Sequence, residues 1–171
     1  MIDYIDISSI DNEKKEITSY KVYEAREAPS RAKLLIKKND VLVSTVRPNL
    51  NAVAMITCET TNKMVASTGF CILRSNGSLD NKYLFYFTRS KSFITKLMRA
   101  AKGASYPAVS NTDVLNISIP FPPLDIQEKI ANELETVSRL LLLQKRKMEE
   151  LDRLIKSVFY NPEFRKYPLI N

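Results

Sequence analysis

A proline-rich segment divides this chain into two parts of different character. Four prolines lie between residues 103 and 124, and proline can neither continue a helix nor donate a ladder hydrogen bond. After this segment, apolar residues recur in alternating steps of four and three, which is a heptad pattern. We therefore predict a long coiled-coil helix over residues 124–160, with a dimerisation seam formed by Ile130, Leu134, Val137, Leu141, Gln144, Met148, Leu151, Ile155 and Val158.

The predicted seam has one polar member, Gln144. A polar side chain at a core position fixes the register or the choice of partner at some cost in stability. Because the chain has 171 residues, we divide it into a globular domain of residues 1–123, the long helix of residues 124–160 and a tail of residues 161–171. A globular part of this size can bury a core.

The sequence of the globular part predicts both short strands and short helices. Residues 41–46 form the strongest strand candidate, because they are rich in β-branched side chains and end at Arg47-Pro48-Asn49. We expect Asp80 and Ser92 to cap two helices. Further strands are expected at residues 4–7, 34–36, 52–57 and 69–74, and a helical turn followed by a strand at residues 113–119. The predicted fold class is α+β: a globular mixed α/β domain followed by a long C-terminal coiled-coil helix.

Charge is distributed unevenly along the chain. Residues 29–124 contain thirteen Lys and Arg but only four Asp and Glu, a net charge of +9. Residues 125–158 contain seven of each sign and are neutral. The positive field therefore belongs to the globular part, as expected for a protein that binds a polyanion. Ordinary solvated lysines are the alternative interpretation.

Residues suited to catalysis are sparse. The chain has no histidine and only three glycines, so imidazole-activated nucleophiles and glycine-rich nucleotide loops are missing. Residues 121–124 (Phe-Pro-Pro-Leu) are superficially similar to a motif of amino-methyltransferases, but they lack its polar first and aromatic fourth residues, and we interpret them as a rigid linker. The carboxylates of the basic region are dispersed. We expect no catalytic residue, no metal and no cofactor.

The sequence also indicates where the protein works. Cys58 and Cys71 are expected to be reduced thiols that are mostly packed, because the chain lacks features of secretion. No window approaches the ~18 uncharged apolar residues of a membrane span, and no signal peptide opens the chain. We expect a soluble cytoplasmic protein without membrane contact.

Four motifs in a fixed order resemble those of a known family. They are residues 40–50 (Asp-Val-Leu-Val-Ser-Thr-Val-Arg-Pro-Asn-Leu), 66–70 (Ala-Ser-Thr-Gly-Phe), 103–107 (Gly-Ala-Ser-Tyr-Pro) and 119–124 (Ile-Pro-Phe-Pro-Pro-Leu), followed by Gln127-Glu128 and the heptad helix. With this combination the chain resembles the specificity subunit of type I restriction-modification systems over nearly its whole length.

The resemblance implies a target recognition domain that reads part of a bipartite sequence in double-stranded DNA. It also implies a helix that sets the half-site spacing and docks methyltransferase (modification) subunits, with a restriction subunit as a further partner. A full-length family member carries two recognition domains and two helices, whereas this chain has one of each and no internal repeat. It therefore resembles a half-subunit, either a natural truncation or an excised half.

A helix with an exposed heptad seam must bury that seam against another helix. A second copy running antiparallel, or another specificity half, would do so and would place two recognition domains at opposite ends. At 1.5 Å per residue the helix is about 50 Å long, and half-sites about 34 Å apart lie on one face of the duplex. We expect such a pair, most simply a homodimer, and an inverted-repeat target with an unread spacer.

The candidate DNA-binding residues fall into two groups. Motifs shared by relatives with different targets hold the fold or grip phosphates, because they cannot encode differing sequences. We assign this role to Arg47, Asn49, Ser67, Thr68, Lys102, Gly103, Ser105 and Tyr106. Base readers are expected in the variable stretches, where Asn51, Lys63, Arg74, Asn76 and Arg99 offer suitable donors.

Alternative interpretations stay open at this point. Arg47-Pro48-Asn49 also suits a strand-ending turn that binds nothing. The aromatic residues among 83–87 are a candidate base-stacking platform, although helical spacing favours a core role. At the level of function, the chain fits a coiled-coil protein-interaction module with only non-specific DNA affinity. A nuclease or other enzyme that acts through isolated carboxylates is a weaker alternative.

Overall fold

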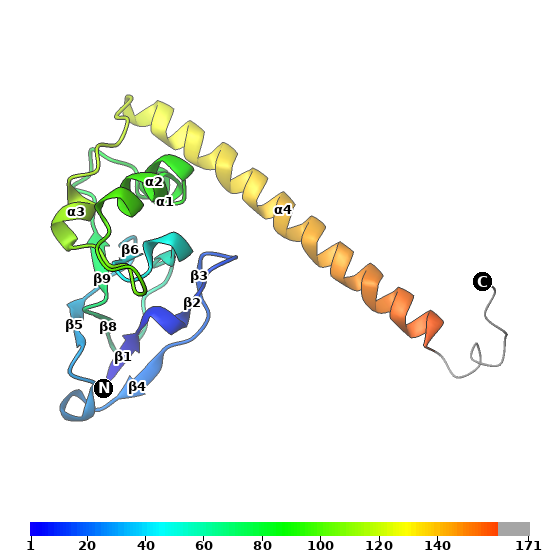
Figure 1. Cartoon of the computed structure of the whole chain (residues 1–171), viewed down its shortest axis with the longest axis horizontal. Coiled ribbons are helices and arrows are strands. Elements are labelled where there is room, and N and C mark those ends of the chain that lie inside the picture. The colour runs from blue at the N-terminus through cyan, green and yellow to red at the C-terminus, as the bar shows by residue number, and fades with distance from the viewer. Residues whose placement is uncertain (161–171) are drawn as a thin grey trace. The chain divides into compact units, whose positions relative to one another are not determined.

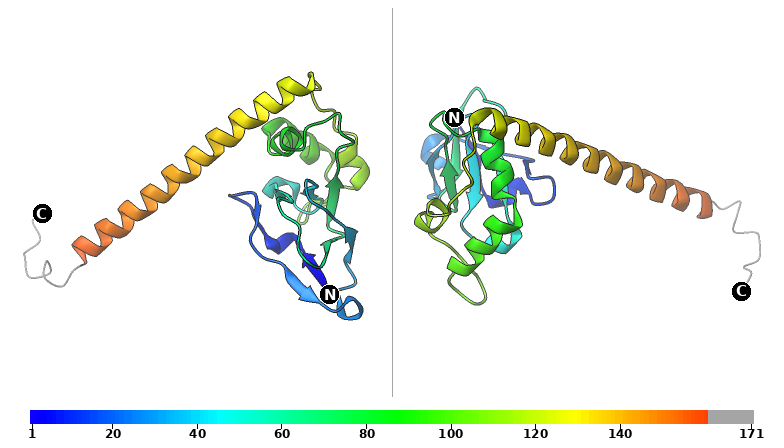
Figure 2. Two further views of the ribbon diagram at one scale, coloured as in Figure 1. Left: turned by 180° about the vertical axis from the view of Figure 1, so that it is seen from behind. Right: turned by 90° about the horizontal axis from the view of Figure 1, so that it is seen from above.

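A computed structural model describes residues 1–160 (Figures 1 and 2). It contains two compact units, Met1–Asn132 and a second unit that begins at Glu133. The division falls inside the long helix α4 (Leu124–Phe159), shortly after the helix begins. The tail predicted for residues 161–171 lies outside the described residues.

The first unit contains three small sheets. Four strands pair in the order β4-β1-β8-β5, namely β4 (Lys21–Tyr23), β1 (Ile2–Ile5), β8 (Lys63–Ser67) and β5 (Ala32–Leu35). In this sheet β1 runs parallel to β8 and antiparallel to β4. A second, antiparallel sheet has the order β7-β6-β9, namely β7 (Val53–Met55), β6 (Val41–Ser44) and β9 (Phe70–Leu73). A hairpin of β2 (Ile10–Asp11) and β3 (Glu16–Ile17) completes the strands.

Strand β6 lies at the centre of the first unit because its two faces enter different cores. Side chains alternate between the faces of a strand. Val41 and Val43 join a buried cluster with Phe93 and other helix residues, whereas Leu42 joins a second cluster with Ile5 of β1. The sheet β7-β6-β9 is therefore covered by helices on one face and by the β1-containing sheet on the other (Figure 1). This layering confirms the α+β prediction.

Three helices supply the helical layer: α1 (Asn81–Thr88), α2 (Lys91–Ala100) and α3 (Asn111–Leu115). Asp80 caps α1 by accepting a hydrogen bond from the Tyr83 amide at 2.7 Å, as predicted. Residues 83–85 are buried, which confirms their core role.

Two predictions for this layer are wrong. The predicted cap Ser92 lies inside the first turn of α2, and Ser90 is the true cap because its hydroxyl accepts from the Phe93 amide at 3.2 Å. Residues 113–119 do not end in a strand. In the described chain, Ile117 and Ile119 pack against the helix-side core without pairing to a sheet.

The strand predictions were best for the second sheet. The strand expected at residues 4–7 lies earlier, at β1, because Asp6 caps a 3-10 turn, η1 (Ile7–Ser9), by accepting from the Ser8 amide. Strands β2, β3, β4 and β8 were not predicted. These strands are short, and β8 depends on pairing with β1 and β5, which are distant in sequence.

Helix α4 has different surroundings along its length. Gln127 is fully buried; its Oε1 accepts from the Asp80 amide at 2.9 Å and its Nε2 donates to the Pro122 carbonyl at 2.8 Å. Ala131, one turn later, is also buried. From Leu134 onwards the apolar seam residues are exposed, with exposed fractions from 41% to 61%. The predicted helix is confirmed.

Candidate nucleic-acid interface

Three motifs that are far apart in sequence meet at the end of β6. The Gly69 carbonyl accepts hydrogen bonds from the Thr45 amide and hydroxyl at 2.9 and 3.0 Å. The Thr45 carbonyl accepts from the Val109 amide at 2.9 Å, and the Arg47 amide donates to the Pro107 carbonyl at 2.8 Å. These hydrogen bonds hold the three motifs together around Thr45 and Arg47.

Residues 102–108 form a closed loop beside this junction. Lys102 and Ala108 exchange two backbone hydrogen bonds of 2.9 Å. Gly103 has φ +95°, and a Cβ there would lie 2.9 Å from the Tyr106 carbonyl oxygen, so a side chain at this position would strain the loop. Ser105 and Tyr106 are exposed near its tip.

Arg47 connects this loop with the neighbouring 3-10 turn η3 (Pro48–Leu50). Its backbone is left-handed, with φ 48°, and it precedes the first residue of the turn. Its guanidinium carbon lies 4.7 Å from the centroid of the Tyr106 ring. This cation–π contact is worth about 0.5 to 1 kcal/mol at an exposed site. The Arg47 residue as a whole is exposed. Asn49 in the turn is also exposed.

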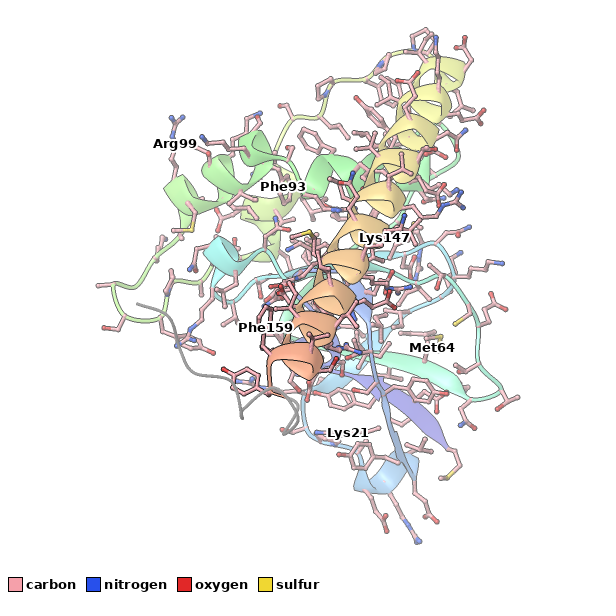
Figure 3. All side chains as sticks on the ribbon, turned by 90° about the vertical axis from the view of Figure 1, so that its right-hand side faces the viewer. Lys21, Met64, Phe93, Arg99, Lys147 and Phe159 are labelled. Carbon is pink, nitrogen blue, oxygen red and sulfur yellow. The ribbon has the colours of Figure 1, made fainter. Side chains whose placement is uncertain are left out.

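The surroundings of this loop and turn are basic. Residues 81–112 contain six Lys and Arg and no Asp or Glu. Helix α2 packs against η3, and Arg99 in its last turn is exposed (Figure 3). Lys102 follows it and is also exposed. The structure therefore places Arg47, Tyr106, Arg99 and Lys102 on neighbouring elements. The Asp113 carboxylate, just after this segment, lies close enough to Lys102 for the lysine charge to contribute to the lowered pKa of Asp113.

The remaining candidates on this side of the chain have structural roles. Asn51 is buried, and its Nδ2 donates to the Thr88 carbonyl at 2.9 Å. Ser67 is buried, and its hydroxyl accepts from the Gly69 amide at 3.2 Å. Thr68 is exposed, and its amide donates to the Arg31 carbonyl at 2.9 Å. In this conformation Asn51 and Ser67 have no surface to offer to DNA.

Lys63 and Arg74 line a separate shallow cavity together with residues of β5 and β8. Arg74 Nε and Nη2 donate to the two carboxylate oxygens of Asp40, both at 2.7 Å, and the Asp40 side chain is only 1% exposed. Hydrogen bonding to Asp40 raises the pKa of Arg74 above its usual value. Figure 3 shows Met64, the neighbour of Lys63, on a different part of the first unit from Arg99.

Asn76, the last predicted base reader, is exposed in a turn. Its Oδ1 accepts hydrogen bonds from the Ser78 hydroxyl at 2.7 Å and from the Ser78 amide at 3.3 Å. Its side-chain amide nitrogen carries two N–H donors, which suit recognition of an acceptor.

Two basic residues that the sequence analysis did not nominate belong to the same region. The Lys15 ammonium donates to the Asn51 carbonyl at 2.5 Å. Arg89 lies over the rings of Phe85 and Tyr86, with centroid distances of 5.1 and 4.9 Å. The position of Lys15 depends on a contact across 36 residues, so no local sequence signal reveals it.

The described residues contain no cluster of three His, Cys, Asp or Glu side chains that could hold a metal ion. Cys71 is buried and Cys58 is exposed; both are free thiols, although only Cys71 is packed as predicted. Within residues 1–160, no helix has the length and apolar character needed to cross a membrane.

A basic surface, a layered α+β domain and a heptad helix are together the features expected of a DNA specificity domain. The chain matches the family model of the type I restriction modification DNA specificity domain over residues 1–153. It therefore belongs to this family.

Two curated relatives are type I restriction enzyme specificity subunits. MjaVIII from Methanocaldococcus jannaschii is 24% identical over 129 residues, which cover 73% of this chain and 30% of that protein. HindI from Haemophilus influenzae is 21% identical over 141 residues, which cover 81% of this chain and 30% of that protein. The chain thus spans about a third of the length of these relatives.

Solved structures show the same fold. The crystal structure of the HsdS subunit from Thermoanaerobacter tengcongensis superposes with a TM-score of 0.79 and 31% identity, covering 99% of this chain and 44% of that one. A structure described in connection with complex assembly and conformational transition of the type I R-M system gives a TM-score of 0.84 and 32% identity, covering 97% and 43%. The chain spans less than half of each.

Proposed function

We propose that this chain is a DNA sequence-recognition unit of a type I restriction-modification system and reads one half of a bipartite target. The observation that carries the proposal is the convergence of three motifs around Thr45 and Arg47. The backbone hydrogen bonds of these motifs serve the fold, but the fold has no need of an exposed guanidinium stacked on an exposed tyrosine. An exposed guanidinium held in this way suits a DNA phosphate.

Within this proposal, the two groups of candidate residues have different tasks. Arg47, Asn49, Lys102, Ser105 and Tyr106 position the DNA backbone, with Thr68 in support and Gly103 allowing the loop to close. The base readers are Arg99, Lys63 and Asn76, whose side chains are exposed. Asn51 and Ser67 support the surface from beneath through the hydrogen bonds described above, and Arg74 holds the buried Asp40 carboxylate at the separate cavity.

Helix α4 provides the surfaces through which the partners bind. Its exposed apolar seam pairs antiparallel with a second copy of the chain, or with another specificity half, and so fixes the distance between two recognition domains. The same helix docks the methyltransferase subunits, and the restriction subunit joins that complex. The chain itself is non-catalytic and works in the cytoplasm, where such a complex meets DNA.

Selection of bound duplexes from a random pool tests the proposal. The purified chain is expected to enrich a split, palindromic motif: two short inverted half-sites separated by a spacer of fixed length and random sequence. A coiled-coil interaction module with only non-specific DNA affinity would enrich no motif, and that result would contradict the proposal.

A second experiment tests the division of labour. The chain alone is expected neither to cleave nor to methylate DNA. Added methyltransferase subunits with S-adenosylmethionine should methylate the selected motif, and scrambling one half-site should abolish this preference. Robust methyl transfer by the chain without any added subunit would contradict a non-catalytic role.

A further inference from the structure

Lys15 and Arg89 form a pair of cations at the end of η3 opposite Arg47. Lys15 lies in the loop of the β2–β3 hairpin, and its ammonium donates to the carbonyl of Asn51, the residue that caps the C-terminal end of η3. Arg89 comes directly after Thr88, the last residue of α1. The Thr88 carbonyl accepts a hydrogen bond from the Asn51 side chain. Asn51 thus joins the two elements that carry the cations.

Both cations are held in position before any ligand arrives. Lys15 has a left-handed backbone, φ 60°, and its amide donates to the Asp11 carbonyl at 2.8 Å. Asp11 Oδ1 accepts from the amides of Glu13 and Lys14 at 2.8 and 3.0 Å, which fixes the loop. Arg89 is fixed by its position over two aromatic rings. Long basic side chains normally lose considerable rotamer entropy on binding, and here part of that cost has already been met in the folded chain.

The pair also lacks full charge compensation. Partial burial lowers the pKa of Lys15, the positive charge of Arg89 lowers it further, and Asp11 opposes this only in part. Asp11 also faces Lys14, whose Nζ lies 3.8 Å from its carboxylate. An anion placed between Lys15 and Arg89 would therefore relieve the repulsion between them.

We propose that Lys15 and Arg89 together bind one backbone phosphate of double-stranded DNA. After its bond to Asn51, the Lys15 ammonium keeps two N–H donors, and the Arg89 guanidinium offers a planar set of donors. A phosphodiester has two free oxygens and can accept from both. Arg47 and Asn51 flank the three residues of η3, so about 8 Å of 3-10 rise separates their backbones, and both positions are close enough to serve one DNA-binding surface. The inference rests on the proposed function and adds two residues to its phosphate contacts.

The experiment measures DNA affinity against salt concentration for the full chain and for Lys15→Gln, Arg89→Gln and the double variant. Each single variant is expected to weaken binding to the selected duplex and to a scrambled duplex by the same factor. Each single variant should also make the slope of log affinity against log salt shallower by less than one unit per recognition domain, because the other cation still contacts the phosphate. The double variant should make it shallower by about one unit per recognition domain, because the two residues share one phosphate.

Two controls separate a specific contact from a general charge effect. Lys14→Gln removes the same charge from the same hairpin, but Lys14 faces Asp11, so the slope should stay unchanged. Lys15→Arg retains the charge and should retain the slope. Thermal unfolding verifies that each variant is folded, and Arg89→Gln carries the test from a separate element if Lys15→Gln disturbs the hairpin.

The outcomes distinguish this inference from the proposed function. An unchanged slope in the Lys15→Gln, Arg89→Gln double variant, with sequence preference intact, overturns the inference alone. An equal loss in Lys14→Gln also overturns it, because the effect is then one of net charge. If the expected slope changes occur without any sequence preference in the unmodified chain, the phosphate site stands and the proposed function fails. A chain that does not bind DNA refutes both.

Discussion

The first unit and the later part of α4 bury their apolar residues in opposite ways. The first unit closes two cores around β6 and leaves mainly polar and basic groups at the candidate interface. Beyond Asn132 the helix has a regular row of apolar side chains, of which Leu141 and Met148 are each 61% exposed. A stable helix in water needs packing for its apolar face. The contrast indicates that the first unit buries its apolar residues by its own packing, whereas the exposed row on α4 is suited to pairing with another helix.

The largest expected effect comes from breaking the helix seam. Replacing Leu141 and Leu151 together by Asp should convert a dimer into monomers at micromolar concentration. Each buried leucine contributes about 1.5 to 3 kcal/mol, so four of them across a symmetric pair contribute about 6 kcal/mol or more, over 10⁴-fold in dissociation constant. Analytical ultracentrifugation measures the change, and the first unit should keep its thermal stability.

Leu143 provides the matched control, because it is an exposed leucine on the same helix but lies outside the heptad seam. Leu143→Asp should leave the dimer intact, whereas Leu141→Asp alone should weaken it strongly. A double variant at Leu141 and Leu151 that stays dimeric at micromolar concentration would place the contact surface elsewhere.

The next effect concerns stability within the first unit. Arg74→Ala removes both hydrogen bonds to the buried Asp40 carboxylate and should lower the free energy of unfolding by about 1 to 3 kcal/mol. Urea denaturation measures this change. Lys63→Ala, on the same cavity, is the control and should have little effect on stability. If Arg74→Ala leaves stability unchanged but impairs binding to the selected motif, Arg74 is a base reader instead.

A smaller effect is expected at the Arg47 surface. Arg47→Ala and Lys102→Ala should each weaken binding to all duplexes and make the salt slope shallower by about one unit per recognition domain. Lys147→Ala, on the charge-balanced helix, should not change the slope. By contrast, Arg99→Ala should cost about 1 to 3 kcal/mol on the selected motif and little on scrambled DNA. Equal losses on both duplexes for every variant would indicate a general polyanion binder.

The smallest expected effect is the pH response of α3. The Ser110 hydroxyl and the Ser110 backbone amide both donate hydrogen bonds to the Asp113 carboxylate. These bonds, the hydroxyl bond more than the amide bond, hold the pKa of Asp113 below its usual 3.8. Because the folded pKa is lowered, this contribution to stability is present above the unfolded pKa and is lost as the pH falls through the folded value. Unfolding curves between about pH 5 and pH 3 should therefore be less pH-dependent for Asp113→Asn than for the original chain. Identical pH dependence would mean that Ser110 does not stabilise the charged form.

Much of the fold could be predicted from local patterns. The β-branched run of β6, the cap at Asp80 and the heptad of α4 are strong signals over short distances, and the structure confirms them. The missed strand β8 has no such signal, because its register is set by Ile2 and other partners far away in sequence. The prediction of Ser92 as the cap of α2 was wrong because Ser90, two residues earlier, is an equally good capping residue.

The candidate site was harder to predict than the fold. The motif order identified Arg47 and Tyr106, but the contact between them depends on how the closed loop meets η3. Sequence reasoning favoured Arg74 and Asn51 for their donors, and it had no means of showing that Asp40 and Thr88 occupy those donors. The burial of a side chain and its hydrogen-bond partners depend on the tertiary structure, so they cannot be inferred from residue type alone.

The most direct test of the account is equilibrium binding to three duplexes of equal length. The first carries both selected half-sites, the second has one half-site scrambled, and the third has both scrambled. We predict that affinity falls at each step and that the first and third duplexes differ by at least about 10³-fold at physiological salt. Equal affinity for all three duplexes would contradict the claim that this chain recognises half of a split DNA sequence.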